Sequence, residues 1–106
     1  MLPQITHLQF LVLGELLKSP APGRKVRDAL SGQGVRKSGP AFYQMMARME
    51  DSGLLEGWYE QQIVDSQIIR ERHYRIVPPG RKAWDACRDF YRGALKAFDR
   101  EGLAHG

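Results

Sequence analysis

Residues 38–53, SGPAFYQMMARMEDSG, carry a helix signal at each end. Ser38 can cap the first free amides of a helix, and Pro40 falls in the first turn, where its missing N–H costs nothing. Gly53 can adopt the left-handed conformation that ends a helix. The larger apolar side chains fall on one side at spacings of three and four, which predicts a helix with one buried face: Phe42, Met45, Met46 and Met49.

The other face of this helix is small, polar and singly basic. Its residues are Ala41, Gln44, Ala47 and Arg48, with Tyr43 beside them. Such a surface suits a helix that enters a DNA major groove. Arg48 can form a bidentate pair with guanine, or an ion pair with Asp51 on its own helix. Gln44 can read adenine through two hydrogen bonds, or it is a solvated amide.

The chain before this helix predicts two more helices. Thr6 and Gln9 are spaced as a capping box, so a helix begins there and runs to about Lys18. It is apolar nearly all round, which indicates burial on more than one side. Gly14 inside it marks either the close approach of another backbone or a tolerated glycine. A second helix is expected over residues 22–30, and its short glycine-containing link to the third gives a helix-turn-helix pattern.

After Gly53 the apolar spacing changes from a helical period to a period of two. We expect strands over residues 54–62 and 70–77, joined as a hairpin with an extended tip at residues 63–69. Alternation directs Tyr74 and Ile76 toward the core and His73 and Arg75 outward.

The last predicted helix covers residues 79–100. Trp84, Tyr91 and Phe98 repeat every seven residues, and Cys87 and Ala94 fill the alternate places. This spacing is typical of a helix that pairs with another helix. We expect the partner to be a second copy of the chain; the alternative is a terminal helix that folds back on its own domain.

Composition favours a single small intracellular domain. The 106 residues contain 42% hydrophobic residues, no apolar run near the roughly 20 residues that span a bilayer, and no secretory signal pattern. One cysteine excludes an internal disulfide and fits a reducing cytoplasm. The net charge is +4, and residues 1–50 carry seven basic against three acidic side chains, which mildly supports a polyanionic partner.

No pattern points to catalysis or to a cofactor. His7, His73 and His105 are far apart, and no Cys/His cluster has metal-ligand spacing. Cys87 is interpreted as a small hydrophobe on the apolar side of its helix. Nucleophile–base sets, paired acids and glycine-rich phosphate loops are missing, so we expect neither an enzyme nor a bound metal.

The order of helix, helix, capped helix, hairpin and long helix resembles the PadR family of bacterial transcriptional regulators, in the small form with one C-terminal helix. The matching segments are 8–14 and 16–17, Ser38, 42–43, 49–50 and 53–55, and 73–76 with 78–81. The resemblance implies an α+β, mainly helical fold. Residues 1–78 form a winged helix-turn-helix with three helices and a two-stranded wing, and residues 79–106 form a dimerisation helix within one compact unit.

The resemblance also implies a cytoplasmic homodimer that binds double-stranded operator DNA, usually as a repressor, and that releases DNA when a small, often aromatic effector binds near the dimer interface. The expected DNA contacts are Arg36, Lys37, Ser38, Ala41, Tyr43, Gln44, Arg48, Arg70 and Arg72. The expected dimer or effector residues are Trp84, Cys87, Tyr91, Ala94 and Phe98.

Two departures from the family pattern matter for function. The third helix has Gly39-Pro40-Ala41 where relatives usually have Pro-Gly-Thr or a similar run, so a hydroxyl is missing. The wing tip surrounds a lone acid, Asp65, with four apolar residues instead of glycine and arginines: Ile63, Val64, Ile68 and Ile69. Exposed apolar side chains in a row more often mark a protein contact. The alternative function is therefore a winged-helix protein-interaction module that has lost DNA binding.

Overall fold

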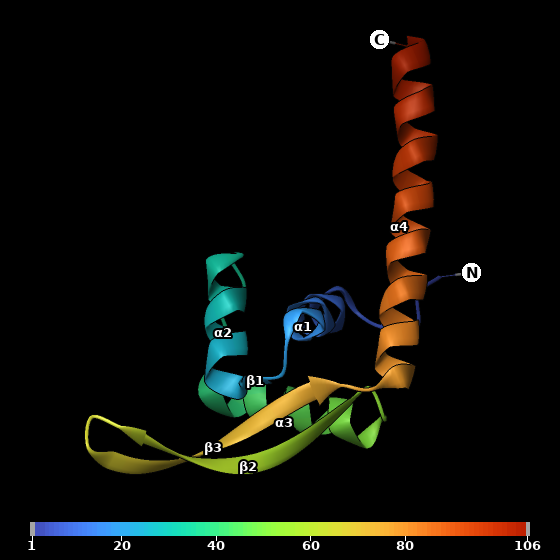
Figure 1. Cartoon of the computed structure of the whole chain (residues 1–106). Coiled ribbons are helices and arrows are strands. Elements are labelled where there is room, and N and C mark those ends of the chain that lie inside the picture. Colours follow the sequence, from blue (N-terminus) through green and yellow to red (C-terminus); the bar gives the residue numbers. More distant parts are fainter. Residues whose placement is uncertain (1, 106) are drawn as a thin grey trace.

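Three short helices and a long hairpin form a head, and one long helix projects from it (Figure 1). The computed structural model describes residues 2–105, and side chains as far as residue 100. The elements in chain order are α1 (His7–Lys18), β1 (Ala21–Pro22), α2 (Gly23–Gly32), α3 (Gly39–Asp51), β2 (Leu55–Val64), β3 (Gln67–Ile76) and α4 (Pro78–His105). The winged helix-turn-helix with a C-terminal helix is therefore confirmed, and α4 continues past the predicted end near Arg100.

The helix ends follow the sequence signals. The Thr6 hydroxyl accepts a hydrogen bond from the Gln9 amide, and the Gln9 side chain accepts one from the Thr6 amide, so the capping box is complete. The Ser38 hydroxyl accepts from the Ala41 amide at 3.3 Å at the start of α3. Gly53 has a φ of 75°, the left-handed conformation expected just past the end of that helix.

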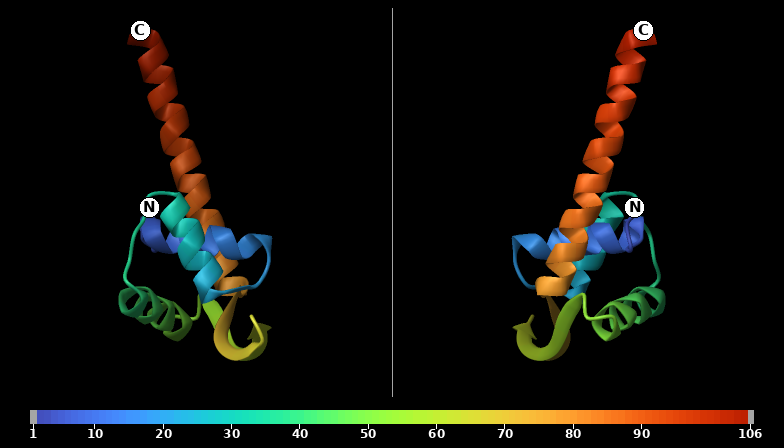
Figure 2. Two further views of the ribbon diagram at one scale, coloured as in Figure 1. Left: turned by 90° about the vertical axis from the view of Figure 1, so that its left-hand side faces the viewer. Right: turned by 90° about the vertical axis from the view of Figure 1, so that its right-hand side faces the viewer.

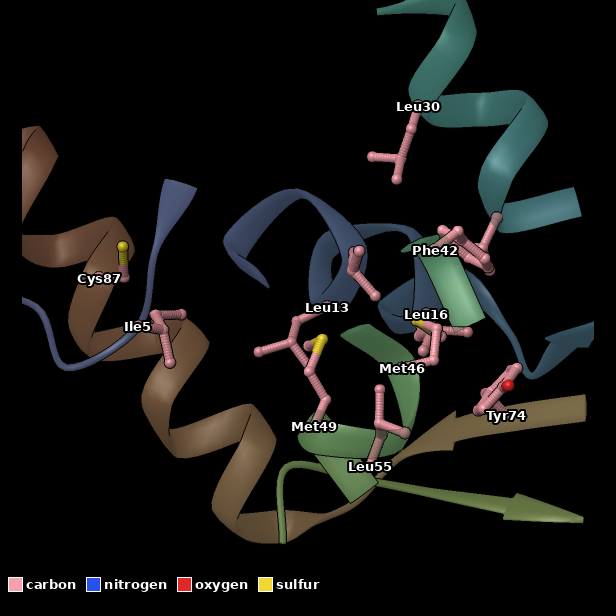
Figure 3. Close-up of a cluster of buried hydrophobic side chains, with 12 residues drawn as sticks. Ile5, Leu13, Leu16, Leu30, Phe42, Met46, Met49, Leu55, Tyr74 and Cys87 are labelled. Carbon is pink, nitrogen blue, oxygen red and sulfur yellow. The ribbon is translucent and has the colours of Figure 1, made fainter. Parts of the chain in front are cut away.

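The core lies where the inner face of α3 meets α1, α2 and the sheet (Figure 3). Phe42, Met46 and Met49 of α3 are fully buried there, and Met45 is partly buried. The other buried side chains of this cluster are Ile5, Val12, Leu13, Leu16, Val26, Leu30, Leu55, Tyr74 and Cys87. Burial of this face leaves the opposite face of α3 toward solvent.

The two-stranded wing is confirmed, but a third strand that was not predicted joins it. Ala21 and Pro22, assigned to a break and to the start of a helix, form the short strand β1, which pairs antiparallel with β3 and gives the order β1-β3-β2. A strand of two residues is too short to show a period in sequence. Pro22 is tolerated because β1 lies at the edge of the sheet.

The expected extended hairpin tip was wrong. The ladder between β2 and β3 continues to the pair Val64–Gln67, and only Asp65 and Ser66 form the turn. Their φ angles are 51° and 65°, and positive values at both central residues are what a tight type I′ turn requires. The wing is consequently a regular β2–β3 hairpin whose strands stay paired up to the turn.

His73 is buried at 6% exposure, although alternation directed it outward. It lies on the sheet face away from α3, where Trp58 stacks on its ring with centroids 6.0 Å apart. Its Nε2 atom lies 3.2 Å from the Glu60 carboxylate and 3.1 Å from the Gln62 amide nitrogen. Side chains of the neighbouring strand thus cover this face. Arg75 is exposed as expected and pairs with Glu56.

The first half of α4 packs on α1 within the same chain. Trp84 stacks on Phe10 with ring centroids 5.4 Å apart, and Tyr91 stacks on His7 at 5.3 Å. Gly14 allows this approach, because a Cβ there would lie 3.2 Å from the Trp84 indole nitrogen. The close neighbour of Gly14 is therefore a side chain and not a second backbone.

Gly80 is the point at which α4 is fixed against the start of the wing. A Cβ at Gly80 would overlap the carbonyl oxygen of Leu54, whereas a Cβ at Gly93, further along α4, would meet open space. We expect Gly80→Ala to lower the free energy of unfolding in urea by about 1–3 kcal/mol through overpacking. Gly93→Ala, the matched control, should raise it by about 0.5–1 kcal/mol through helix propensity. A Gly80→Ala variant as stable as the wild type would contradict this contact.

Tyr74 gives the fold a pH dependence at the alkaline end. Burial, helped by the nearby Glu50 carboxylate, raises the pKa of Tyr74 to about 12. The unfolded chain loses this proton near pH 10, before the folded chain does, so stability falls between pH 10 and 12. We expect this residue to remove about 1 kcal/mol of unfolding free energy between pH 9 and pH 11. Tyr74→Phe should flatten that decline in urea titrations, whereas Tyr59→Phe, at an exposed ring, should not.

Candidate nucleic-acid interface

The solvent-facing side of α3 presents the side chains expected to read DNA. Gln44 and Arg48 are exposed, and Ala41 is half-buried at the start of the helix. Within the part of the chain whose side chains are described, the Arg48 guanidinium makes no hydrogen bond or ion pair, so the expected pair with Asp51 is not formed. The side chain with the most donors on this face is therefore available to an external acceptor.

The link between α2 and α3 contains three residues expected to contact phosphate, and they differ in exposure and in hydrogen bonding. Arg36 is exposed. Lys37 is half-buried, and its carbonyl oxygen accepts a hydrogen bond from Arg27 Nε at 3.0 Å, which ties the link to α2. Ser38 is exposed, but its hydroxyl already caps α3. This segment thus offers two cations beside the N-terminal end of α3.

A groove of about 650 Å³ separates α3 from the wing. Figure 2 shows the two elements side by side at the end of the molecule opposite the C-terminal end of α4. Both elements line the groove, through Tyr43, Ala47 and Glu50 from α3 and through Tyr59, Arg70, Glu71, Arg72 and Tyr74 from the sheet. The structure therefore brings Tyr43, Arg70 and Arg72 together, three residues that lie far apart in the sequence.

Arg72 is engaged inside the protein. It donates from Nη2 to Glu50 Oε1 at 2.5 Å and from Nε to Glu50 Oε2 at 3.3 Å, in a two-pronged ion pair between β3 and α3. The hydrogen bond to Glu50 raises the pKa of the Arg72 guanidinium. This pair makes Arg72 a residue that positions the wing against α3, whereas sequence alone suggested a direct phosphate contact.

Arg70 is the freer of the two wing arginines. It is exposed, and its guanidinium lies over the ring of Tyr59, 4.2 Å from the centroid. The other acid of the groove, Glu71, accepts a hydrogen bond from Arg24 Nε of α2 at 2.9 Å, and this bond lowers the pKa of the Glu71 carboxyl. Both groove carboxylates therefore have arginine partners, which leaves the Arg70 charge without an acidic partner among the described side chains.

Sequence reasoning missed four residues of this region: Arg24, Glu50, Tyr59 and Glu71. Tyr59 could have been found, because an aromatic residue on the same strand face as Gly57 and Gln61 lies opposite Arg72 once the hairpin register is known. The two acids could not, because their partners lie 22 and 47 residues away.

The expected dimer and effector residues of α4 separate into two groups. Trp84, Cys87 and Tyr91 pack on the chain's own core, and burial raises the pKa of the Cys87 thiol, as suits a small hydrophobe. Ala94 is half-buried and Phe98 is 74% exposed, as is Leu95 at 62%. We call the apolar side of α4, from Trp84 to Phe98, the α4 ridge. Among its described side chains, those of the second half, Leu95 and Phe98, are the ones open to contact with another helix.

An apolar hollow of about 350 Å³ lies between α1 and α4. Its lining is His7, Phe10, Leu11, Tyr91 and Leu95. The Tyr91 hydroxyl oxygen lies 3.2 Å from His7 Nε2 at this site. Of the residues expected to contact an effector, only Tyr91 lines the hollow.

Among the described residues, no group of three or more His, Cys, Asp or Glu side chains is placed to hold a metal ion. The same part of the chain contains no helix with the length and apolar character needed to cross a membrane.

The sequence matches no protein-family model and no curated protein. Solved structures do match. A PadR-family transcription regulator from Clostridium difficile has a TM-score of 0.75 at 16% identity, over 90% of this chain and 97% of that one. A PadR-family regulator from Eggerthella lenta gives 0.66 at 24% identity, over 88% and 79%.

Bacillus subtilis PadR, solved in complex with operator DNA, gives a TM-score of 0.60 at 17% identity, over 81% of this chain and 47% of that one. The chain thus has the fold of the PadR-family transcriptional regulators, a winged helix-turn-helix followed by a C-terminal helix.

Proposed function

We propose that this chain is a PadR-type transcriptional regulator that binds operator DNA as a homodimer. The observation that carries the proposal is the outward face of α3, where Gln44 and Arg48 are exposed beside a wing on the same end of the molecule. The likeness to a PadR protein crystallised with operator DNA supports it. A regulator of this kind works where the chromosome is, in the bacterial cytoplasm.

In this proposal α3 enters the major groove. Arg48 pairs with guanine through two hydrogen bonds, Gln44 pairs with adenine, and the Ala41 methyl group touches a thymine. Arg36, Lys37, Tyr43 and Arg70 approach phosphates, which fixes the position of the helix on the duplex. The contribution of Arg72 is indirect, through its ion pair with Glu50.

The dimer in this proposal forms through the second half of α4. Leu95 and Phe98 expose most of their surface on a helix that extends well beyond the head (Figure 1). Pairing of two such ridges buries them and places two α3 helices on one duplex, where half-sites one helical turn apart give about 10 bp between centres. Occupation of an operator by such a dimer would repress transcription.

Release by a small effector is the last part of the proposal. The hollow between α1 and α4 has aromatic walls, Phe10 and Tyr91, and two polar groups, His7 and the Tyr91 hydroxyl. Flat apolar walls with a few polar atoms suit a planar aromatic compound. The hollow lies between α1, which belongs to the head, and α4, whose second half forms the proposed dimer contact. A ligand bound there can therefore change the angle between α4 and the head, and with it the distance between the two heads of the dimer.

A second candidate function is a protein-interaction module that has lost DNA binding. The observation in its favour is the apolar wing tip, where Ile63 and Ile68 are 79% and 73% exposed. The two functions differ in one measurement, because only the regulator binds duplex DNA at low salt and weakens steeply as salt rises.

Removal of the Arg48 guanidinium tests the DNA-reading role of α3. We expect Arg48→Ala to weaken binding to a duplex selected from a random pool by about 1–3 kcal/mol, measured by fluorescence anisotropy, and to weaken binding to random duplex much less. Lys96→Ala removes one positive charge from an exposed site on α4 and should leave both affinities nearly unchanged. Equal losses on both duplexes would reduce Arg48 to a phosphate contact, and no duplex binding by the wild type would refute the regulator.

A charge on the open half of the α4 ridge tests the dimer. We expect Phe98→Glu to convert the dimer to a monomer in sedimentation velocity at micromolar concentration, because two carboxylates would be buried in one interface. Gly93→Glu introduces the same charge where a side chain meets open space and should leave the dimer intact. A wild-type chain that sediments as a monomer would contradict the assembly.

A further inference from the structure

The end of the wing carries an exposed pair of isoleucines. Ile63 and Ile68 are cross-strand partners, separated from the Asp65–Ser66 turn by the Val64–Gln67 pair. Their side chains are 79% and 73% exposed. Large apolar side chains at the tip of a narrow hairpin gain nothing from solvent. Their exposure on a rigid two-stranded ladder therefore points to a contact that forms outside this chain.

The isoleucine pair lies on the wing face that looks toward α3. Side chains alternate between the two faces of a strand, so Ile68, Arg70 and Arg72 share one face of β3. Arg72 on this face is bonded to Glu50 of α3. The tip pair consequently continues the surface formed by the outward side of α3, the groove and Arg70.

The wing extends past Arg72 by a distance of the same order as the spacing of DNA grooves. Ile68 lies four residues beyond Arg72, which corresponds to about 13 Å along an extended strand. The minor groove next to an occupied major groove lies half a helical turn away, about 17 Å along the duplex. With α3 in the major groove, we expect the phosphate strand between the grooves to pass the groove lined by Tyr43, Tyr59 and Arg70, and the tip to reach the minor groove.

We propose that Ile63 and Ile68 insert from the minor groove between two stacked base pairs and bend the DNA. The inference rests on the proposed function and adds to it how the wing takes part in binding. Apolar side chains that partly unstack a base step kink a duplex, and the protein gains contact area in return. Arg70, on the same face two residues from Ile68, is placed to hold the phosphate strand beside the wedge.

The size and shape of the tip favour DNA over a protein partner. The isoleucine side chains project from the hairpin and are slim enough to enter a minor groove about 6 Å wide, whereas the hairpin backbone, whose strand axes alone are about 4.8 Å apart, stays outside it. Two isoleucines expose less surface than two aromatic side chains, which bury about 150–250 Å² each. That area is far below the roughly 800 Å² per partner of a stable protein interface.

Asp65 supplies an independent measure of where the tip lies. Its carboxylate stands in the turn next to the isoleucine pair. The Debye length is about 10 Å at 0.1 M ionic strength and about 30 Å at 0.01 M, so at low salt a tip in the groove leaves the Asp65 carboxylate within range of the phosphates. Asp65→Asn should therefore raise DNA affinity at low ionic strength by a fewfold, an increase that salt removes.

The central experiment uses the full chain and a duplex selected from a random pool, with 2-aminopurine placed at successive positions across the site. We expect the wild type to raise the fluorescence at one step flanking the α3 contact, which reports unstacking. Ile63→Thr with Ile68→Thr should abolish that rise and lower affinity by roughly tenfold, the scale of a few buried methyl and methylene groups. Threonine keeps the β-propensity of the strands.

The matched control is Val64→Thr with Ile69→Thr, on the same two strands but on the opposite wing face, where both residues are half-buried. It should keep both the fluorescence rise and the affinity.

Wild-type binding with no 2-aminopurine signal, together with no loss of affinity in the Ile63/Ile68 variant, would overturn the insertion of the isoleucines and leave the proposed regulator intact. An oligomeric state that changes only in the Ile63/Ile68 variant would assign the tip to a protein contact and also overturn it. Failure of the wild type to bind any duplex would overturn both proposals.

Discussion

The architecture depends on α1 being buried from two sides. Val12, Leu13 and Leu16 pack into the core shared with α2, α3 and the sheet, while Phe10 packs on Trp84 of α4. A helix that is apolar nearly all round can fill both positions at once. The head and the projecting helix therefore both pack on one central helix. Gly14 lets Trp84 of α4 approach that helix closely, and Gly80 lets the start of α4 lie against the Leu54 carbonyl.

Ion pairs set the second level of organisation, the placement of the wing. Glu50–Arg72 joins α3 to β3, and Arg24–Glu71 joins α2 to the same strand. Exposed ion pairs contribute little to stability, but the Glu50–Arg72 pair is bidentate and partly buried, so it restricts orientation as well as distance. These contacts engage two arginines and two acids with one another. Around α3 and the groove, Arg36, Arg48 and Arg70 remain exposed and Lys37 is half-buried.

The parts that could be predicted from sequence are those decided by neighbours along the chain. Ser38, Gly53 and the capping box mark helix ends through local hydrogen bonds, and the apolar spacing of α3 fixes its buried face. The errors have a different origin. A heptad such as Trp84, Tyr91 and Phe98 shows that another helix covers it but not which one, and here α1 covers the first two. The burial of His73, the strand β1 and the partner of Arg72 depend on contacts between distant segments. The tight turn at Asp65 and Ser66 lacks the Asn-Gly or Gly residues that announce one.

The same division of the α4 ridge explains how an effector could act at a distance. The half that packs on α1 holds the head, and the half with Leu95 and Phe98 is the half left for a partner helix. The apolar hollow lies where these halves meet, with Tyr91 on one side and Leu95 on the other. The part of α4 from Tyr91 back to Pro78 is about 20 Å long at 1.5 Å per residue, so a tilt of about 5° at the hollow moves the start of the helix, where the head is attached, by about 2 Å. In the proposed dimer two α3 helices meet successive major grooves at a fixed spacing, so a displacement of that size at each head would weaken binding of the pair without any change in the surface that contacts DNA.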